Sequence, residues 1–396
     1  MVCATSVRLP LDGFRDGFRT WLAPDGAGAE VLAPFRAGPA GSHEDHVALG
    51  LQLSAVLWEH GWKRYGWPET VGGVGGGPRY RAVYYDELCR AGLFVPEPDQ
   101  PTEVLAPAVL HHAPDLAEHV LPGLLAGREV WGQGFSELDA GSDLASLRTR
   151  AIQAGSGYRI NGQKTWMSNG HLAHRLFVLA RTGTPESRHR GITAFLLDAD
   201  APGVTRRPLV FASGVTELCE VFFDDVEVSA DTVVGQVDGG WAVAMYLLQY
   251  ERSMYAAQRQ AWLLARLRDL AALVGGDAHP AAAAVLGRAW AAVGTVRART
   301  AETVRRLDGG EMVGPEASAD KILLATAEQA VFDAAKELLG AGFLLDPDNR
   351  DWRDQWWYSR AATIYGGSIE VQRTILADHV LSLPPETSKP SRVEER

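Results

Sequence analysis

The first third of the chain carries apolar side chains at helical spacing. Phe14 and Phe18 lie four residues apart, and apolar residues recur with the same period through Val47–Trp62. Glycine clusters and prolines interrupt the pattern and mark where helices end. Further helices are predicted at Arg79–Arg90 and, as two short segments, between Leu105 and Gly127. Residues 1–130 are therefore predicted to form an α-helical domain.

Near Trp131 the pattern changes to alternation of apolar and polar residues, which is typical of half-buried strands. The pair Asn161-Gly162 stands between two alternating runs, 157–160 and 163–168, and this arrangement predicts a β-hairpin with a two-residue turn. Further strands are predicted at 176–181, 192–197, 204–210 and 218–228. Residues 131–236 are predicted to form a compact β-domain.

Helical spacing returns after Gly239 and extends over longer segments. The predicted helices cover Trp241–Leu273, Pro280–Leu307 and Glu316–Leu339, and a closing segment follows at 364–381. The pattern predicts a C-terminal helical domain at 237–385 and, because residues 386–396 are polar, a disordered tail. Together the three parts indicate an α+β fold.

Composition narrows the possible functions. The chain has 396 residues, 46% of them hydrophobic, and a formal net charge of -11, so no basic surface for nucleic acid is expected. Its three cysteines form no CxxC pair, and no apolar run reaches the ~18 residues of a membrane span. The first ten residues lack the apolar stretch of a secretory signal. These features predict a cytoplasmic protein.

The glycine clusters contain neither a G-x-G-x-x-G nor a Walker A sequence, which argues against a Rossmann or P-loop enzyme. His43-Glu44-Asp45-His46 could be considered as metal ligands, but the cluster has no HExxH pattern and no distant partner. A solvated surface is the better interpretation of this cluster, and no metal site is predicted.

Two segments at the edges of the β-domain could carry chemistry. Phe135–Asp143 combines hydroxyls, glycine and small residues in a turn that could present N–H groups to an anion, although an ordinary capped loop would look similar. Trp166–Gly170 ends a predicted strand with a large flat side chain beside a hydroxyl. Such a tryptophan could stack on a planar cofactor, or it could simply belong to the core.

Read together, these segments resemble the acyl-CoA dehydrogenase flavoprotein family. Residues 131–150 are similar to the family's first flavin-contacting segment, 161–170 to its second, and 364–373 to its C-terminal signature. The tryptophan and glycine residues of 61–73 resemble the family's N-terminal helical domain. The resemblance covers residues 12–384, and it implies an N-terminal helical domain, a middle β-barrel or sandwich and a C-terminal four-helix bundle.

The resemblance also implies FAD as the cofactor and assigns residues to it. Phe135, Ser136, Trp166 and Ser168 would line the flavin ring, and Ser142 would lie near the pyrophosphate or the substrate thioester. Glu337 and Gly340 belong to a segment that would reach the adenosine half of a neighbouring subunit's FAD. The full set of cofactor-binding candidates is Phe135, Ser136, Gly141, Ser142, Trp166, Ser168, Glu337, Gly340, Ser368 and Glu370.

The family reaction needs a carboxylate that removes a proton α to the thioester carbonyl. Many members carry it in the C-terminal signature, where this chain has Gly366. Other members place it in an acidic-arginine pair on the first long helix of the C-terminal domain, and Glu251-Arg252 resembles that pair. Glu251 is therefore the predicted base, ahead of Asp351 and Asp354, and the substrate-binding candidates are Ser142, Arg252 and Gly366.

Some positions depart from the family pattern. The segment 276–280 replaces an arginine-containing sequence that holds the FAD pyrophosphate from the next subunit, and Leu138 stands where proline is usual. With Gly366-Gly367, the chain resembles most closely the actinobacterial branch that acts on bulky acyl groups, including steroid side chains.

The leading hypothesis is FAD-dependent α,β-desaturation of an acyl thioester carried by CoA or an acyl carrier protein. An electron-transferring flavoprotein is the implied acceptor, and the assembly is a homodimer, a homotetramer or a mixed tetramer. A flavin-dependent oxidase or hydroxylase on the same fold is the alternative, because an oxygenase needs no α-proton base. A structural partner without flavin is disfavoured by the intact segments around Ser136 and Trp166.

Overall fold

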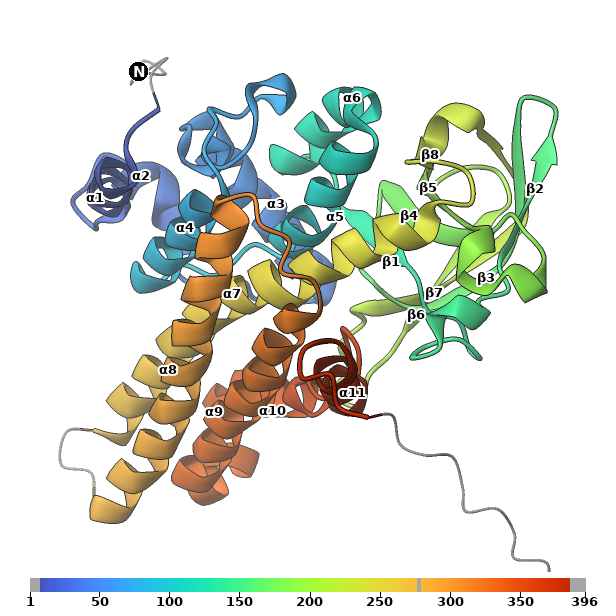
Figure 1. Cartoon of the computed structure of the whole chain (residues 1–396). Helices are drawn as coiled ribbons and strands as arrows, with labels where there is room; N and C mark the ends of the chain where they lie inside the picture. Colours follow the sequence, from blue (N-terminus) through green and yellow to red (C-terminus); the bar gives the residue numbers. More distant parts are fainter. Residues whose placement is uncertain (1–7, 276–278, 385–396) are drawn as a thin grey trace, which may run out of the picture.

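The computed structural model describes residues 8–275 and 279–384. The predicted tail at 386–396 lies outside the described residues, and so does most of the segment 276–280, which differs from the family pattern. Helices occupy the N-terminal part, strands the middle and long helices the C-terminal part (Figure 1). Within the described ranges, no helix combines the length and apolarity that crossing a membrane would require.

The first four N-terminal helices pack their apolar faces into one cluster that includes Phe14, Phe18 and Trp21. The spacing of these side chains explains the packing, because residues three and four apart share one face of a helix. The next two helices belong to a second cluster that they share with the sheet and the C-terminal helices. Ser42 caps the third helix through a reciprocal capping box with Asp45, which gives part of the His43–His46 cluster a structural role. The helices are α1 (Leu11–Leu22), α2 (Ala29–Leu32), α3 (His43–Glu59), α4 (Pro78–Arg90), α5 (Asp99–His112) and α6 (Pro114–Leu125).

The middle part is one mixed sheet in the order β6-β7-β3-β2-β4-β5-β8, with β1 paired in parallel to β4. Its inner face buries alternate residues such as Leu176, Val178 and Phe195. The strands are β1 (Trp131–Gly134), β2 (Arg150–Ala154), β3 (Gly157–Ser168), β4 (Arg175–Arg181), β5 (Ile192–Asp198), β6 (Val204–Leu209), β7 (Leu218–Ser229) and β8 (Val233–Val234).

The predicted hairpin turn at Asn161-Gly162 is wrong. β3 runs through both residues without reversing, and the chain turns instead between β2 and β3 at Gly155-Ser156. The pairing of β3 with β7 shifts register at Gly162, and a Cβ on this residue would come within 2.7 Å of the Cα of Thr149. Glycine is needed here for a bulge and a close approach of backbone rather than for a turn.

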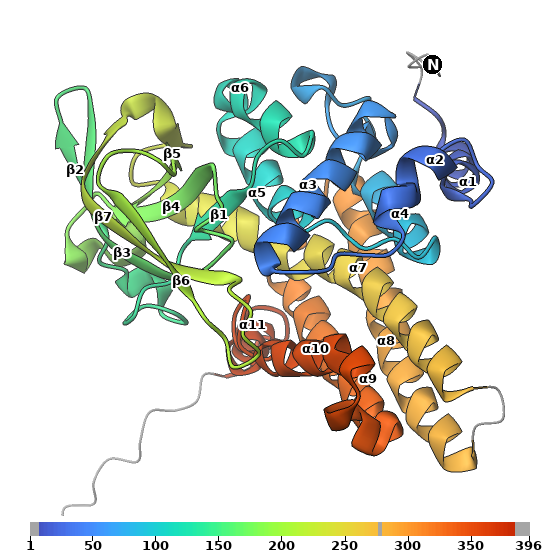
Figure 2. The ribbon, with the colours of Figure 1, turned by 180° about the vertical axis from the view of Figure 1, so that it is seen from behind.

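The C-terminal part is built on α7 (Gly240–Val274), α8 (Pro280–Asp308) and α9 (Ala317–Leu345), which pack against one another, and α10 (Arg350–Ala361) packs on α9. Figures 1 and 2 show α7 running from the sheet, past α5, into this bundle. The predicted closing segment at 364–381 is a turn followed by the shorter α11 (Ile369–His379). The first half of α7 therefore lies where all three parts of the chain meet.

A buried ion pair holds the loop after β1 against β3. The Lys164 ammonium lies 2.8 Å from a carboxylate oxygen of Glu137, with their side chains 0% and 9% exposed. Glu137 also accepts hydrogen bonds from the backbone N–H groups of Arg148 and Thr149. Although burial opposes ionisation, Lys164 and these donors lower the pKa of Glu137. This carboxylate therefore ties both ends of the loop that contains the 135–143 segment to one strand.

Glu137→Ala should lower the free energy of unfolding by roughly 3 kcal/mol, because it leaves the buried Lys164 ammonium without its partner. Urea unfolding measures the change. Asp139→Ala is the matched control: Asp139 pairs with Arg148 at the surface, with side chains 72% and 78% exposed, and its loss should cost less than about 1 kcal/mol. Equal effects of the two substitutions would contradict the role given to Glu137.

Candidate active site

The Glu251 carboxylate lies where α7, β1 and the turn before α11 meet. Gln133, on β1, donates a hydrogen bond of 3.2 Å from its amide nitrogen Nε2 to Glu251 Oε2. The other carboxylate oxygen faces Gly366: a Cβ built on that glycine would lie 3.3 Å from Glu251 Oε1. The structure thus brings together two candidates that are 115 residues apart in the chain.

Gly366 adopts a φ of +63°, in the left-handed region that favours glycine. A Cβ at this position would also meet Cε of Lys321, on α9, at 3.2 Å. The turn is anchored beside it, because the Lys321 ammonium donates to the carbonyl oxygen of Ala362 at 2.6 Å and Tyr365 donates to Glu328 at 3.1 Å. The turn therefore presents backbone, and no side chain, to the Glu251 carboxylate.

The aromatic candidates lie at the end of the sheet. The backbone N–H of Thr165 donates to the carbonyl oxygen of Ser136 at 2.9 Å, which places the segment after β1 beside the end of β3. Phe135 is buried, whereas the Trp166 side chain is 59% exposed and its backbone has a φ of +60°. The core alternative for Trp166 is wrong: the strand bulges here and turns the indole out of the sheet.

A half-buried carboxylate lies behind Ser168. Glu217, just before β7, accepts hydrogen bonds from the hydroxyls of Ser168 at 3.3 Å and of Tyr358, on α10, at 3.4 Å. Burial raises the pKa of Glu217 to about 7, and the Glu97 carboxylate adds to the rise, while His43 opposes it. This group links the end of β3 to the C-terminal helices.

The other candidates are more dispersed. Gly141 and Ser142 are exposed on the loop after β1, and Glu370 is exposed in the first turn of α11, where Ser368 caps the helix by accepting from the N–H of Val371. Glu337 and Gly340 are exposed on α9, roughly 24 Å and 28 Å along the helix from Lys321 at 1.5 Å per residue. This pair therefore lies far along α9 from the lysine beside the Gly366 turn.

Arg252 follows Glu251 on α7 and is half-buried. Among the described residues its Nε has no hydrogen-bond partner, and burial lowers the pKa of the guanidinium. The Arg252 guanidinium is thus free to meet a ligand. Elsewhere in the site, the exposed planar indole of Trp166 and the hydroxyls of Ser136 and Ser168 are groups that a planar, polar-edged cofactor would satisfy. The residues present therefore fit a flavin.

Sequence reasoning missed Gln133, Lys321 and Glu217. Gln133 stands inside the motif at 131–143, but only the parallel pairing of β1 with β4 and the path of α7 bring it to Glu251. Lys321 and Glu217 lie outside the motifs that resemble the family. Nothing in the sequence pattern marked either of these two residues.

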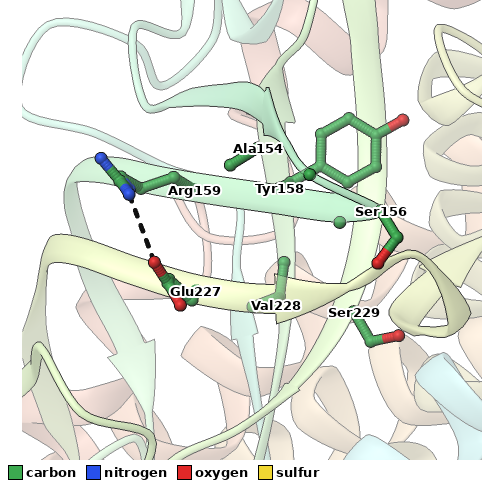
Figure 3. A pocket seen from close by; sticks show the side chains of 9 residues that line it. Ala154, Ser156, Tyr158, Arg159, Glu227, Val228 and Ser229 are labelled. Atoms are coloured by element: carbon green, nitrogen blue, oxygen red, sulfur yellow. Dashed lines mark hydrogen bonds and ion pairs between the residues drawn. The ribbon is translucent and has the colours of Figure 1, made fainter.

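A separate pocket of about 500 Å³ opens on the surface beside the turn between β2 and β3. Figure 3 shows Arg159 and Glu227 reaching toward each other across it, at 3.2 Å. None of the candidate site residues lines this pocket. It is a hollow of the sheet edge and not part of the site around Glu251.

The chain is similar to known proteins over most of its length. A model of the acyl-CoA dehydrogenase middle domain matches residues 132–226, and a model of the acyl-CoA dehydrogenase C-terminal domain matches residues 238–381. A Mycobacterium tuberculosis protein described as acyl-CoA dehydrogenase IpdE1 is 36% identical over 390 residues, which cover 95% of this chain and 98% of that protein. The Mycolicibacterium smegmatis protein of the same description is 35% identical, with 94% and 98% covered.

Among solved structures, one described as the Tcur3481-Tcur3483 steroid ACAD is similar to this chain with a TM-score of 0.80 and 26% sequence identity. The alignment covers 96% of this chain and 99% of the solved one. The similarity extends through all three parts of the fold, so the helical, sheet and helical plan predicted from the sequence is confirmed.

Trp166→Ala should weaken FAD binding about tenfold with little change in stability, because the indole is exposed in the flavin-free chain and stacking contributes roughly 1 kcal/mol beyond the area that it buries. Titration of flavin-free protein with FAD, followed by flavin fluorescence, measures the affinity. Trp290→Ala, which removes a 52% exposed indole on α8, is the matched control. Unchanged affinity in Trp166→Ala would contradict a contact between the indole and the ring.

Glu217→Gln should make stability less dependent on pH. An unfolded glutamate titrates near 4.3, whereas burial raises the pKa of Glu217 to about 7 in the fold. The folded state binds more protons between those values, so this group lowers stability as pH rises from about 4 to about 7. Melting temperatures across that range should fall less steeply in the variant than in the parent. Glu227→Gln, at a 76% exposed side chain, should keep the parent slope, and a parental slope in Glu217→Gln would disprove the assignment.

Proposed function

Because this chain belongs to the acyl-CoA dehydrogenase family of FAD-dependent oxidoreductases, we propose that Glu251 is the base in the desaturation of its acyl-CoA thioester. The observation that supports this proposal is the meeting of the Glu251 carboxylate with the side-chain-free turn at Gly366. A carboxylate reaches the place beside the turn from α7, although the turn itself offers none.

The residues around Glu251 suit a base that acts on a weakly acidic C–H. Removal of the α-proton leaves negative charge on the thioester oxygen, so the base must be ionised before the reaction and its orientation must be fixed. Gln133 fixes one carboxylate oxygen by donating to it, and the other oxygen faces the open turn. Glu251 can therefore accept a proton at Oε1 from a carbon held between the turn and β1.

FAD, when bound, supplies the acceptor for the hydride that leaves the β-carbon. Trp166, Phe135 and Ser136 would hold its ring against the end of β3, and Ser168 would contact the ring with its hydroxyl backed by Glu217. Gly141, Ser142, Ser368 and Glu370 would contact other parts of the cofactor. Glu337 and Gly340 would act on the cofactor of a neighbouring subunit, in keeping with their exposed place on α9.

The substrate that we propose is a bulky acyl-CoA, with Arg252 and Ser142 near the thioester. Gly366 adds no side chain beside the proposed base, and the solved structure with 26% identity is described as a steroid ACAD. The description of that solved structure joins two designations, Tcur3481 and Tcur3483. It supports a mixed assembly as an alternative to a homo-oligomer. An electron-transferring flavoprotein is the acceptor expected for either assembly.

Glu251→Gln should lower desaturation at least about a thousandfold, because the amide cannot accept the proton. The variant should still bind FAD, since Glu251 is not among the groups proposed to hold the ring. Anaerobic addition of acyl-CoA thioesters of increasing bulk, with loss of the oxidised flavin absorbance as the readout, measures the reaction directly and shows which acyl groups are used.

The matched control is Glu302→Gln, which removes an exposed carboxylate that pairs with Arg305 on α8. Its rate of flavin bleaching should equal that of the parent. Near-parental bleaching in Glu251→Gln, with FAD bound, would show that another group removes the proton.

A further inference from the structure

One carboxylate oxygen between the sheet and the C-terminal helices has no partner in the fold. Glu217 accepts hydrogen bonds from the Ser168 hydroxyl at 3.3 Å and the Tyr358 hydroxyl at 3.4 Å, and both hydroxyls donate to the same oxygen, Oε1. Among the described residues, Oε2 accepts no hydrogen bond, and it keeps contact with solvent. An ionised carboxylate can accept about four hydrogen bonds. Glu217 therefore has acceptor capacity that the fold leaves open.

The backbone fixes the place of this carboxylate. The N–H group of Asn169 donates to the carbonyl oxygen of Glu217 at 2.7 Å, and the neighbouring Ser168 pairs with Leu218 in the ladder of β3 and β7. The end of β3 therefore determines where the Glu217 side chain leaves the sheet. Since β3 and α10 each supply a hydroxyl to Oε1, the carboxylate is oriented before a ligand binds, and a ligand does not have to order it.

Three tyrosines lead from the proposed base to this carboxylate. Tyr255 follows Glu251 by one turn of α7, so the two side chains share a face of the helix. The ring centroid of Tyr255 lies 6.3 Å from that of Tyr365, which in turn lies 5.9 Å from that of Tyr358. The Tyr358 hydroxyl then donates to Glu217. We call these three residues the tyrosine wall, and it extends from the turn beside the base to the end of β3.

The basic groups near Glu217 have other partners. The Arg259 guanidinium is paired with Glu328 at 2.8 Å, and Nε2 of His43 lies 2.6 Å from the amide oxygen of Asn169. Within the part of the chain that the structure describes, Glu217 forms no ion pair with these groups. Burial raises the pKa of Glu217 to about 7, which is the direction expected of a carboxylate with few donors. A ligand with a hydrogen-bond donor would therefore meet an acceptor that is not already used.

A ligand that covers Oε2 must replace the solvent that reaches it. A hydrocarbon acyl group would exclude that solvent and leave the oxygen unsatisfied, whereas a hydroxyl on the acyl group would donate to it. We propose that Glu217 is a specificity-determining residue: its Oε2 accepts a hydrogen bond from a hydroxyl of the substrate, so the preferred substrate is a bulky hydroxylated acyl-CoA. This inference rests on the proposed function, in which the acyl group lies along the tyrosine wall between Glu251 and the flavin at Ser168.

The test is a ratio: kcat/KM for a hydroxylated acyl-CoA divided by kcat/KM for the same acyl group without the hydroxyl. The probes are cyclohexylpropanoyl-CoA with derivatives hydroxylated at each ring position, and cholanoyl-CoA with its hydroxylated derivatives. In the parent, the best hydroxylated probe should exceed its hydrocarbon counterpart at least about tenfold, as expected for a hydrogen bond to a charged acceptor. Glu217→Met should abolish this preference. Glu217→Gln, which keeps a neutral acceptor, should reduce it and serves if the methionine variant does not fold.

A second measurement avoids turnover and separates this inference from the base assignment. Anaerobic calorimetry on FAD-loaded Glu251→Gln protein should give dissociation constants with the same preference for the hydroxylated probe. The double variant with Glu217→Met should bind both probes of a pair equally. Flavin bleaching in Glu251→Gln would overturn the base assignment alone, because the ratio of kcat/KM values still tests the role of Glu217.

The matched control is Glu227→Gln, at an exposed carboxylate on β7, which should keep the parental ratio. Failure of every hydroxylated probe to exceed its hydrocarbon counterpart in the parent would overturn the proposal, and so would a ratio that Glu217→Met and Glu217→Gln leave unchanged. The flavin ring also carries an N–H donor. If Oε2 met that donor instead, both variants would weaken FAD binding at least about tenfold without changing the ratio, which contradicts the role in substrate choice.

Discussion

The close approach of the Glu251 carboxylate to the backbone of Gly366 is the contact on which the site depends. A Cβ at position 366 would crowd Cε of Lys321 at 3.2 Å and Oε1 of Glu251 at 3.3 Å. The turn also requires a positive φ that only glycine adopts without strain. Glu251 on α7, the proposed base, and the glycine in the turn therefore fit together at close range.

The sheet side of the site depends on a different kind of contact. The Glu137–Lys164 ion pair is buried, and removing either partner would leave a charge without compensation. Its geometric effect is to fix the loop after β1 against β3, so that Ser136 and Trp166, from separate motifs, become neighbours through the Thr165 hydrogen bond. The motif that the sequence displays at 135–143 is therefore held in place by a carboxylate within the motif and a lysine outside it.

The sequence predicted the order of a helical part, a sheet and a second helical part. It could do so because the spacing of apolar residues is a local property that repeats along every long helix or strand. It misjudged Asn161-Gly162, because a glycine needed for a bulge and one needed for a turn have the same local surroundings, and only contact with Thr149 distinguishes them. It paired Glu251 with Gly366 through family resemblance, whereas Gln133, Lys321 and Glu217 escaped notice. Those three act through partners more than 40 residues away in sequence, on other helices or strands, and periodicity contains no information about such partners.

Burial differs between the two halves of the site, and the difference indicates how the site is completed. On the base side, Lys321, Glu328 and Arg259 already have partners within the chain, and the turn is tied to α9. On the sheet side, the Trp166 indole is 59% exposed, which leaves a large apolar surface in water. Removal of apolar surface from water is favourable, so a planar ligand gains most binding free energy by covering the indole and gains little by rearranging the turn. The proposed base is therefore organised by the fold before any ligand arrives, and the proposed cofactor surface is completed by the ligand that covers it.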